Sequence, residues 1–392
     1  MITNKQTLNQ IKKRIGKKPL FYITRYKERA SGLGKLKNYK IITNTPPKDT
    51  PEILEKKSLP LSSIIVFKNN VKIQRLVKQK KLKLLNPDYH LVEKYENKIS
   101  QYKWLKTIIP ANLPKTVITT PDKSSFQKLS KTLGSSFIGQ FNRSHTGQGT
   151  LLISQTKQWK ELIEKFPQRK IKCTRFINSP AITVNVCLWQ KCILIGTPSY
   201  QITGLKQLTD FPYSTTGNDW SLAQKTLNSN DFKTIKVLSE KIGQAMIKNG
   251  WQGLFGIDFI KDKKWLVIEI NARQPASTGL ETFLQKKQGK GITIFAAHVA
   301  ALLQLPLPET CEQIEKSFQR IDQGAQIIIR KKNKNNLKFK KINYPDIKII
   351  KGDLKTEKHN TELFRIQNLK SGFITENNQL NAFAKQLLKN FK

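Results

Sequence analysis

The sequence has no apolar stretch long enough to cross a bilayer. Its most apolar segment, residues 291–308, contains His298 and Gln304 and is shorter than a membrane span, so it predicts a buried helix. The N-terminus has no apolar region of the kind that a secretory signal requires. These two absences lead us to expect a cytoplasmic protein with no membrane association.

Cysteine and histidine are also scarce. The chain has 4 of each, with no C-x-x-C pair and no cluster that would supply zinc ligands. The sequence therefore favours neither a zinc site nor a disulfide framework. We expect the cysteines to be buried thiols, as small apolar side chains commonly are in a reducing compartment. They are Cys173, Cys187, Cys192 and Cys311.

Acidic residues are few against the basic ones, 27 against 70, which gives a formal net charge of +43. Such a charge is compatible with a nucleic-acid partner. However, only 11 of the basic residues are arginine and 59 are lysine, with frequent asparagine and isoleucine, as in residues 331–336. AT-rich coding DNA would produce that bias, and lysine is the weaker residue for bidentate phosphate recognition. Nucleic-acid binding is therefore possible but not favoured.

The length of 392 residues and the 38% hydrophobic content suit two or three domains with a sizeable core. In residues 1–95, short apolar runs alternate with helical spacing at 71–81, which predicts a small α/β unit. We expect residues 1–15, which are polar, to be frayed. The expected strands are residues 20–23, 39–42 and 62–67.

Three further units follow. Residues 96–195 begin with a helix at 97–109 and continue as a small subdomain of strands and helices with a glycine-bearing loop. Residues 196–310 contain a long amphipathic helix, 231–248, capped by Asn249-Gly250 and followed by a β-hairpin. Residues 311–392 predict short strands and a last helix that complete the larger subdomain. The overall fold class is α/β (α+β).

The hairpin joins residues 254–260 to 265–271. With Asp262 and Lys263 as a two-residue turn, one face of the ribbon carries only apolar cross-strand pairs, and burial would select this register. The predicted pairs are Phe255 with Ile270, Ile257 with Ile268, and Phe259 with Leu266.

The opposite face of the same hairpin carries oxygen ligands. In this register Asp258 lies opposite Val267 and diagonally beside Glu269, while Asn271 points the same way as Glu269. Two carboxylates this close repel unless a cation lies between them, and hard oxygen ligands suit Mg²⁺ (or Mn²⁺). Arg273 follows on the same side, where it can bind an anion or a developing phosphoryl charge.

These residues resemble the metal-binding strands of the ATP-grasp superfamily, where an acidic residue precedes Glu-x-Asn-x-Arg by about a dozen positions. The matching segments are 256–259 and 269–273, and the order of units agrees over roughly residues 60–310. The branch with biotin carboxylase and carbamoyl-phosphate synthetase is the most similar. The resemblance implies an ATP-grasp fold, with an N-terminal pre-grasp unit and a small lid subdomain.

The resemblance also implies site residues. Asp258, Glu269 and Asn271 would bind the metal, and catalysis would involve Arg273, Lys98 and Arg143. Two positions depart from the family: Gln140 replaces a lysine before the glycine-bearing loop, and Thr174 replaces an acidic residue at the hinge. The residues implied in nucleotide binding are Lys98, Gln140, Ser144, Thr146, Gly147, Gly149, Arg175, Phe176 and Ile177.

The implied activity is a two-step ligation. ATP phosphorylates a small-molecule carboxylate, and an amine then displaces phosphate from the acyl phosphate. Residues 200–204 and 213–220 are expected at the acceptor pocket. Two alternatives remain open, a basic nucleic-acid-binding protein and a non-catalytic ATP-binding relative, the second because of Gln140 and Thr174.

Overall fold

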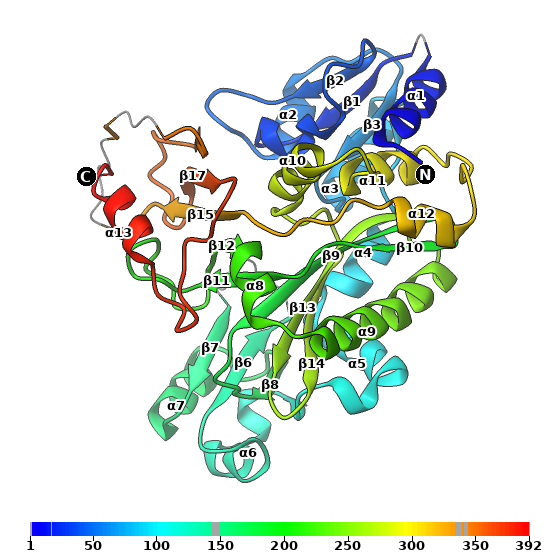
Figure 1. The fold of residues 1–392 in the computed structure, drawn as a ribbon. Coiled ribbons are helices and arrows are strands. Elements are labelled where there is room, and N and C mark those ends of the chain that lie inside the picture. The colour runs from blue at the N-terminus through cyan, green and yellow to red at the C-terminus, as the bar shows by residue number, and fades with distance from the viewer. Residues whose placement is uncertain (1, 17, 143–148, 334–338, 341–343, 392) are drawn as a thin grey trace.

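The chain forms three β-sheets with helices packed around them, as a computed structural model shows (Figure 1). The structure describes residues 2–16, 18–142, 149–333, 339–340 and 344–391. Within that part of the chain, no helix is both long enough and apolar enough to cross a membrane.

The first sheet belongs to the N-terminal unit and is parallel, in the order β2-β1-β3-β4. Its central strand β1 is buried at all four residues, which explains its uninterrupted apolar sequence. The predicted strands and the predicted helix are confirmed. The elements are α1 (Asn4–Ile15), β1 (Leu20–Ile23), η1 (Lys27–Leu33), β2 (Tyr39–Ile42), α2 (Thr50–Lys56), β3 (Ser63–Val66), α3 (Val71–Gln79) and β4 (Lys83–Leu84).

The prediction of a frayed N-terminus is wrong. Residues 4–15 form helix α1, which Thr3 and Gln6 begin with a reciprocal capping box. Ile11 is fully buried in the core beneath this helix. The polar residues on the exposed side of α1 conceal a narrow apolar stripe, and tertiary packing stabilises the helix.

Helices α4 (Tyr89–Glu96) and α5 (Lys98–Ile108) lead to the second, antiparallel sheet, in the order β5-β8-β6-β7. This small sheet packs against α6 and α7 around its own core, which includes Phe137 and Trp159. It lies at the opposite end of the molecule from the N-terminal sheet (Figure 1). Its elements are η2 (Pro110–Asn112), β5 (Thr116–Thr119), η3 (Pro121–Lys123), α6 (Phe126–Leu133), β6 (Phe137–Phe141), β7 (Thr150–Ile153), α7 (Thr156–Lys165) and β8 (Ile171–Arg175).

The third sheet has nine strands, in the order β14-β13-β9-β11-β12-β15-β17-β16, with β10 paired to β9. Strands β9 and β10 were expected in the small subdomain that ends at residue 195, but they pair in this larger sheet. The strands are β9 (Ala181–Trp189), β10 (Cys192–Ile195), β11 (Ser199–Thr203), β12 (Thr215–Asp219), β13 (Gly253–Lys261), β14 (Trp265–Asn271), β15 (Ala325–Arg330), β16 (Ile347–Lys351) and β17 (Glu362–Asn368).

Both faces of β9 are buried, each against a different helix layer. Val184 and Val186 pack in the cluster that includes α9, whereas Cys187 and Trp189 pack in the cluster that includes α1 and α11. The two-residue period of a strand produces this division. The helices of this part of the chain are α8 (Trp220–Thr226), α9 (Ser229–Lys248), α10 (Thr278–Gln288), α11 (Ile294–Leu302), α12 (Cys311–Ser317) and α13 (Ala382–Leu388).

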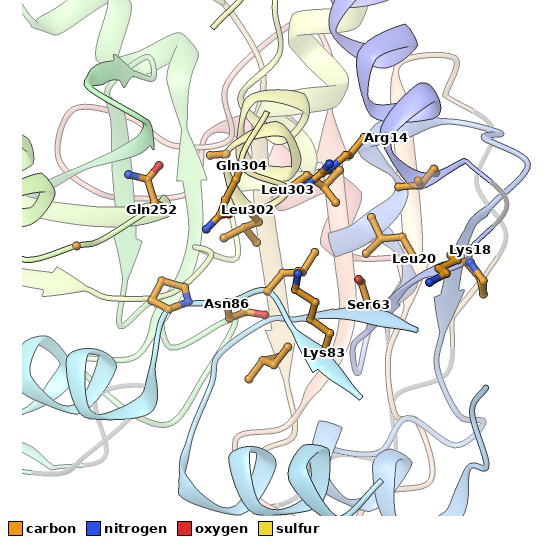
Figure 2. Close-up of a pocket in the computed structure, with 17 residues that line it drawn as sticks. Arg14, Lys18, Leu20, Ser63, Lys83, Asn86, Gln252, Leu302, Leu303 and Gln304 are labelled. Atoms are coloured by element: carbon orange, nitrogen blue, oxygen red, sulfur yellow. The ribbon is translucent and has the colours of Figure 1, made fainter. Parts of the chain in front are cut away.

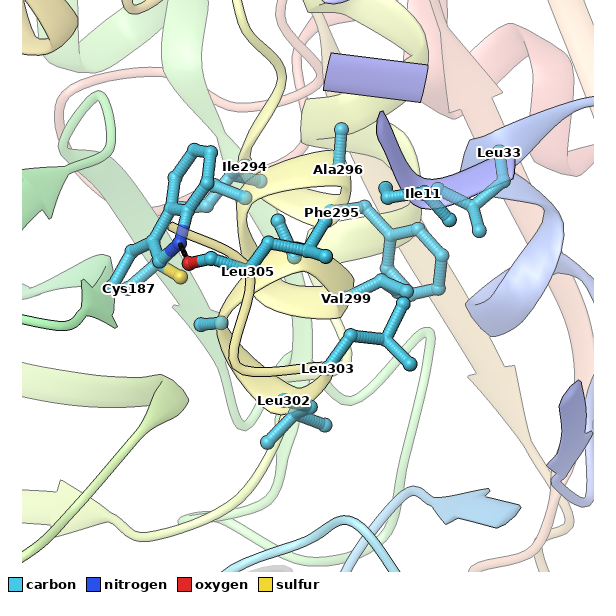
Figure 3. Packing of buried hydrophobic residues seen from close by; sticks show 14 of the residues in the cluster. Ile11, Leu33, Cys187, Ile294, Phe295, Ala296, Val299, Leu302, Leu303 and Leu305 are labelled. Carbon is cyan, nitrogen blue, oxygen red and sulfur yellow. Dashed lines mark hydrogen bonds between the residues drawn. The ribbon is translucent and has the colours of Figure 1, made fainter. Parts of the chain in front are cut away.

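The apolar segment 291–308 contains the buried helix that its sequence predicts. Every residue of α11 is buried, and Figure 3 shows Phe295 extending from this helix toward Ile11 and Leu33 of the N-terminal unit. The carbonyl of Leu305, just beyond the helix, accepts a hydrogen bond of 2.9 Å from the indole nitrogen of Trp189. This helix therefore joins the N-terminal unit to the large sheet.

The expectation of four buried thiols is wrong for one pair of cysteines. Cys192 at the start of β10 and Cys311 at the start of α12 form a disulfide. They are separated by 119 residues, so their spacing in the sequence gave no indication of the pair. Cys173 and Cys187 are buried thiols as expected.

Candidate active site

The hairpin β13–β14 places the predicted carboxylates directly opposite each other. Asp258 pairs with Glu269, and Gly256 pairs with Asn271. The register shifts by one residue between Asp258 and Phe259, and the turn contains three residues, 262–264. The predicted register, with Asp258 opposite Val267 and a two-residue turn, is therefore wrong.

A β-bulge at Ile268 accounts for the difference. The extra residue changes which side faces the core in the part of β14 that precedes it, so Val267 packs in the same apolar cluster as Phe259 and Ile270. Val267 was expected beside the carboxylates and Ile268 in the core; instead Val267 is in the core cluster and Ile268 is only partly buried and outside it. The prediction that Asp258, Glu269 and Asn271 share one face is confirmed.

Asp258 is buried, and each of its carboxylate oxygens accepts one hydrogen bond. Its two carboxylate oxygens accept from the Thr183 hydroxyl at 2.8 Å and from the Asn271 amide nitrogen at 3.0 Å. Burial, together with the negative charge of Glu269, raises the pKa of Asp258 to about 6. Two carboxylates that oppose each other's ionisation in this way are a favourable place for a cation.

Glu269 and Asn271 already have cationic partners. The Lys98 ammonium lies 2.7 Å from Glu269 Oε1, and Arg273 Nη2 donates to Asn271 Oδ1 at 2.7 Å. Burial alone would raise the pKa of Glu269, but the positive charges of Lys98, Lys172 and Arg273 together outweigh burial, so the pKa is lowered. Glu269 is therefore an ionised carboxylate, as a metal ligand must be.

The donor set fits a hard divalent ion that shares its coordination with phosphate. Within the described ranges, no group of three or more His, Cys, Asp or Glu side chains could hold a metal by itself. The protein here offers two carboxylates and one amide oxygen. Mg²⁺ is commonly bound by one or two carboxylates together with water and nucleotide phosphates.

Two buried lysines approach this face from different elements. Lys98 is the first residue of α5, where Asn97 caps the helix and fixes its start. Lys172 lies in β8, directly opposite Gln140 of β6. Burial and the nearby charge of Lys98 lower the pKa of Lys172 to about 8.

Lys172 was missed by the sequence reasoning. Gln140 indicated that a phosphate-binding lysine was absent, yet Lys172 places an ammonium on the neighbouring strand at the paired position. In the sequence it is one of several lysines that alternate with apolar residues, a pattern typical of a solvated strand face. Only the pairing of β6 with β8 distinguishes Lys172 from the lysines that are exposed to solvent.

Arg273 is held by an acidic residue that the sequence analysis did not identify. Arg273 Nη1 donates to Glu96 Oε1, while the Lys68 ammonium donates to Glu96 Oε2 at 2.6 Å. Burial would raise the pKa of Glu96, but these two cations outweigh it and lower the pKa to about 2. Glu96 therefore fixes Arg273 beside the carboxylate pair.

The glycine-bearing loop falls largely outside the described residues. Arg143, Ser144, Thr146 and Gly147 all lie in the undescribed segment 143–148, so their roles stay predictions. Gly149 is described, in the turn that precedes β7.

The predicted adenine-binding segment lies where the chain passes from the small sheet to the large one. Arg175 ends β8 and donates to Asp262 in the hairpin turn at 2.8 Å. Phe176 and Ile177 follow, partly buried, before β9 begins at Ala181. This position between the two sheets is compatible with the predicted role, which stays a prediction.

The predicted acceptor segments contain strands β11 and β12, which pair with each other. Gln201 donates to Thr183 Oγ1 at 3.2 Å, and Thr183 in turn donates to Asp258. Asp219 has a structural role, because its carboxylate accepts hydrogen bonds from the backbone nitrogens of Leu222 and Phe373. Gln201, which reaches Asp258 through Thr183, is therefore better placed than Asp219 to contact a molecule bound at the carboxylates.

A cavity in the described part of the chain lies away from these residues. It measures about 650 Å³ and opens where β1 and β3 begin, bordered by Arg14, Lys18 and Lys83 (Figure 2). Ligands of parallel sheets bind beyond the carboxyl ends of the strands, and this cavity is at the amino ends. None of the predicted site residues lines it.

Comparison with solved structures identifies the class of fold as that of the ATP-grasp ligases. N5-carboxyaminoimidazole synthase from Aspergillus clavatus, in complex with ADP and the aminoimidazole ribonucleotide, matches with a TM-score of 0.66 and 13% identity over 95% of this chain and 99% of that one. The synthetase from Staphylococcus aureus matches with a TM-score of 0.64 and 14% identity over 96% and 97%.

A biotin carboxylase shares the fold as well. The biotin carboxylase domain of Hydrogenobacter thermophilus 2-oxoglutarate carboxylase, in complex with MgADP, ADP and bicarbonate, matches with a TM-score of 0.62 and 11% identity, over 100% of this chain and 88% of that one. No family model matches the sequence, and no curated protein matches it either. The expected fold class and its likeness to biotin carboxylase are confirmed.

Proposed function

We propose that this chain is an ADP-forming ligase that uses ATP to join a carboxylic acid to an amine. The observation that carries the proposal is the convergence of Asp258 and Glu269 with Lys98, Lys172 and Arg273 on one face of the ATP-grasp fold. The carboxylates can bind a divalent ion, and the cationic side chains beside them can bind the phosphates of a nucleotide.

Asp258, Glu269 and Asn271 would hold Mg²⁺ (or Mn²⁺), which neutralises phosphate charge when bound. Lys98 and Lys172 bind and orient the phosphates of ATP. In the first step, an oxygen of the substrate carboxylate attacks the γ-phosphorus, and the bond from that phosphorus to the bridging oxygen breaks to release ADP. In the second step, the amine attacks the acyl carbon, phosphate leaves with the electron pair of the C–O bond, and the departing phosphate takes up the proton that the nitrogen loses.

Arg273 stabilises the negative charge that both steps develop on the transferred phosphoryl group and on the acyl oxygen. Its own position depends on Glu96, which accepts a hydrogen bond from it and remains ionised at neutral pH. Because the guanidinium is held in place before substrate binds, little reorganisation is needed when the charge develops.

The alternatives gain no support from the structure. A non-catalytic relative was suggested by Gln140 and Thr174; Lys172 supplies a buried cation at the position paired with Gln140, which weakens the first of these two reasons. A nucleic-acid-binding role would rest on the net charge alone. The cytoplasmic location stays a prediction.

The test is metal-dependent ADP formation, measured with panels of carboxylic acids and amines. The unmodified chain should form ADP only with Mg²⁺ or Mn²⁺, and Glu269→Gln should reduce the rate by at least about 100-fold through loss of a ligand charge. Glu240→Gln, on the exposed side of α9, is the matched control. ADP formation that persists in Glu269→Gln at the control rate would overturn the proposal.

A further inference from the structure

Arginine is gathered in one region of this molecule. The chain has 59 lysines and only 11 arginines. Five of the 11 lie in connected positions around the loop that follows β14. Where a chain rich in lysine uses arginine, the planar guanidinium fork offers bidentate binding that an ammonium cannot. The five residues are Arg25, Arg29, Arg273, Arg330 and Arg365.

Two of these arginines are paired within the protein. Arg365 makes a bidentate ion pair with Glu362, at 2.8 and 2.9 Å, and donates to the Ala276 carbonyl at 3.0 Å. Arg25 lies 3.1 Å from Asp49 and 3.6 Å from Asp353. Their charges are compensated, and through Asp353 and Glu28 these pairs connect the N-terminal unit with the C-terminal segment.

Arg29 has no such partner. Its guanidinium lies 4.8 Å from the centre of the Tyr26 ring and 4.2 Å from that of Phe67. Within the described residues, the side chain of Arg29 makes no hydrogen bond or ion pair, and its Nε is buried without a partner. Stacking fixes the plane of the guanidinium and leaves its hydrogen-bond donors unused.

The side chain of Arg330 also has a hydrogen-bond donor without a partner. Two of its nitrogens donate to the carbonyls of Asn360 and Thr215, at 3.1 and 2.8 Å, but its Nε is buried without a partner. No carboxylate of the described residues lies within ion-pair distance of it. Burial lowers the pKa of Arg330 and outweighs the charge of Glu362, which would raise it; the charges of Arg365 and Arg29 add to the lowering.

The neighbouring acidic residues do not balance these charges. Glu362 is committed to Arg365, and Glu28 has no hydrogen bond to either oxygen, with Arg365 Nε as its nearest cation at 3.5 Å. Three guanidinium groups thus face two carboxylates in a region shielded from water. A buried excess charge is costly unless an anion accompanies it.

This region is continuous with the candidate active site. Gln274, the residue after Arg273, donates to the backbone carbonyl of Arg29 at 2.7 Å. Phe67, on which Arg29 stacks, and Arg273 both contact a void of about 10 Å³, which is smaller than any substrate. The hydrogen bond of Gln274 and this shared neighbour place Arg29 close to Arg273.

We propose that the acid substrate of this ligase carries a second anionic group besides the carboxylate that is phosphorylated, and that Arg29 and Arg330 bind that group. The reacting carboxylate must lie beside Asp258 and Glu269, where Arg273 is already paired with Glu96. Arg29 and Arg330 come from η1 and β15, on other parts of the fold. The second group is an oxyanion, either a carboxylate or a phosphate, and the inference rests on the proposed function.

Binding to the full chain without ATP tests this proposal separately from catalysis. The probes are succinate and glutarate against their monoamides, and 3-phosphoglycerate against glycerate, all at constant ionic strength in a calorimeter. We expect at least one dianion to bind at least about 10-fold more tightly than its monoanionic counterpart, since charge-assisted bidentate pairs are among the strongest hydrogen bonds. The preferred pair distinguishes a carboxylate from a phosphate.

Arg29→Gln and Arg330→Gln should each remove that preference, and Arg75→Gln, which changes an exposed arginine of α3, should keep it. Should Arg29→Gln fail to fold, Arg29→Lys keeps the charge but not the fork, and should reduce the preference. The proposal is overturned if no dianion is preferred, or if the preference survives in the Arg29 and Arg330 variants. Neither result affects the metal-dependent ADP formation that tests the proposed function.

Discussion

Substitution of Glu96 by glutamine should strongly destabilise the protein, because two buried cations depend on this one carboxylate. Its side chain is 7% exposed and accepts from both Lys68 and Arg273. The shift of its pKa from the ordinary 4.5 to about 2 corresponds to about 3 kcal/mol, at about 1.4 kcal/mol per pH unit. Glutamine keeps the shape of the side chain and removes this contribution.

The pH dependence follows from the direction of the shift. Since the folded pKa is below the unfolded one, the stabilisation is complete above about pH 4.5 and is lost as the pH falls toward 2. Urea unfolding should therefore show a difference of about 3 kcal/mol between the two proteins at pH 7, which shrinks below pH 4.5.

The matched control for this experiment is Glu55→Gln. Glu55 lies 2.8 Å from Lys72, but both side chains are exposed, by 41% and 56%. An exposed pair contributes less than about 1 kcal/mol. If Glu96→Gln cost no more than Glu55→Gln, the argument that Glu96 holds Arg273 would be refuted.

Three further predictions concern other parts of the molecule. Lys172→Gln should raise the KM for ATP by about 10- to 100-fold in steady-state kinetics, through loss of a charge-assisted hydrogen bond, whereas exposed Lys170→Gln should leave it unchanged. Burial lowers the pKa of His298 from 6.5 to about 3, so urea unfolding should show stability falling by up to about 1.4 kcal/mol per pH unit below pH 6.5, a contribution that His298→Gln removes. Reduction of the Cys192–Cys311 disulfide, which spans 119 residues, should cost about 2–5 kcal/mol in denaturant unfolding.

Each of these predictions can fail in a specific way. An unchanged KM in Lys172→Gln would place the phosphates away from β8. Equal acid sensitivity in His298→Gln and the unmodified chain would show that this imidazole is not kept neutral by burial. Unchanged stability on reduction would indicate that the two cysteines are not paired in the folded protein.

The sequence was sufficient to place the carboxylates on a common face because apolar and polar residues alternate along both strands of the hairpin. It was not sufficient for the register. The bulge at Ile268 changes which residues face the core, and an isoleucine is compatible with either side of a strand. Asp258 and Glu269 are therefore directly opposite each other, whereas the predicted register placed them diagonally.

Residues that act through long-range pairing could not be recognised from the sequence. Lys172 becomes significant only when β8 lies beside β6, and Glu96 only when α4 reaches the end of β14. Local signals do not distinguish these residues from the many lysines and glutamates exposed on the surface. The disulfide between Cys192 and Cys311 was missed for the same reason.

The most direct test of the account is a crystal structure of the chain with Mg²⁺ and a non-hydrolysable ATP analogue. We expect the ion to lie about 2.0–2.1 Å from carboxylate oxygens of Asp258 and Glu269, with the ammonium groups of Lys98 and Lys172 at the phosphates. A nucleotide bound elsewhere, or an ion that touches neither carboxylate, would contradict the central claim.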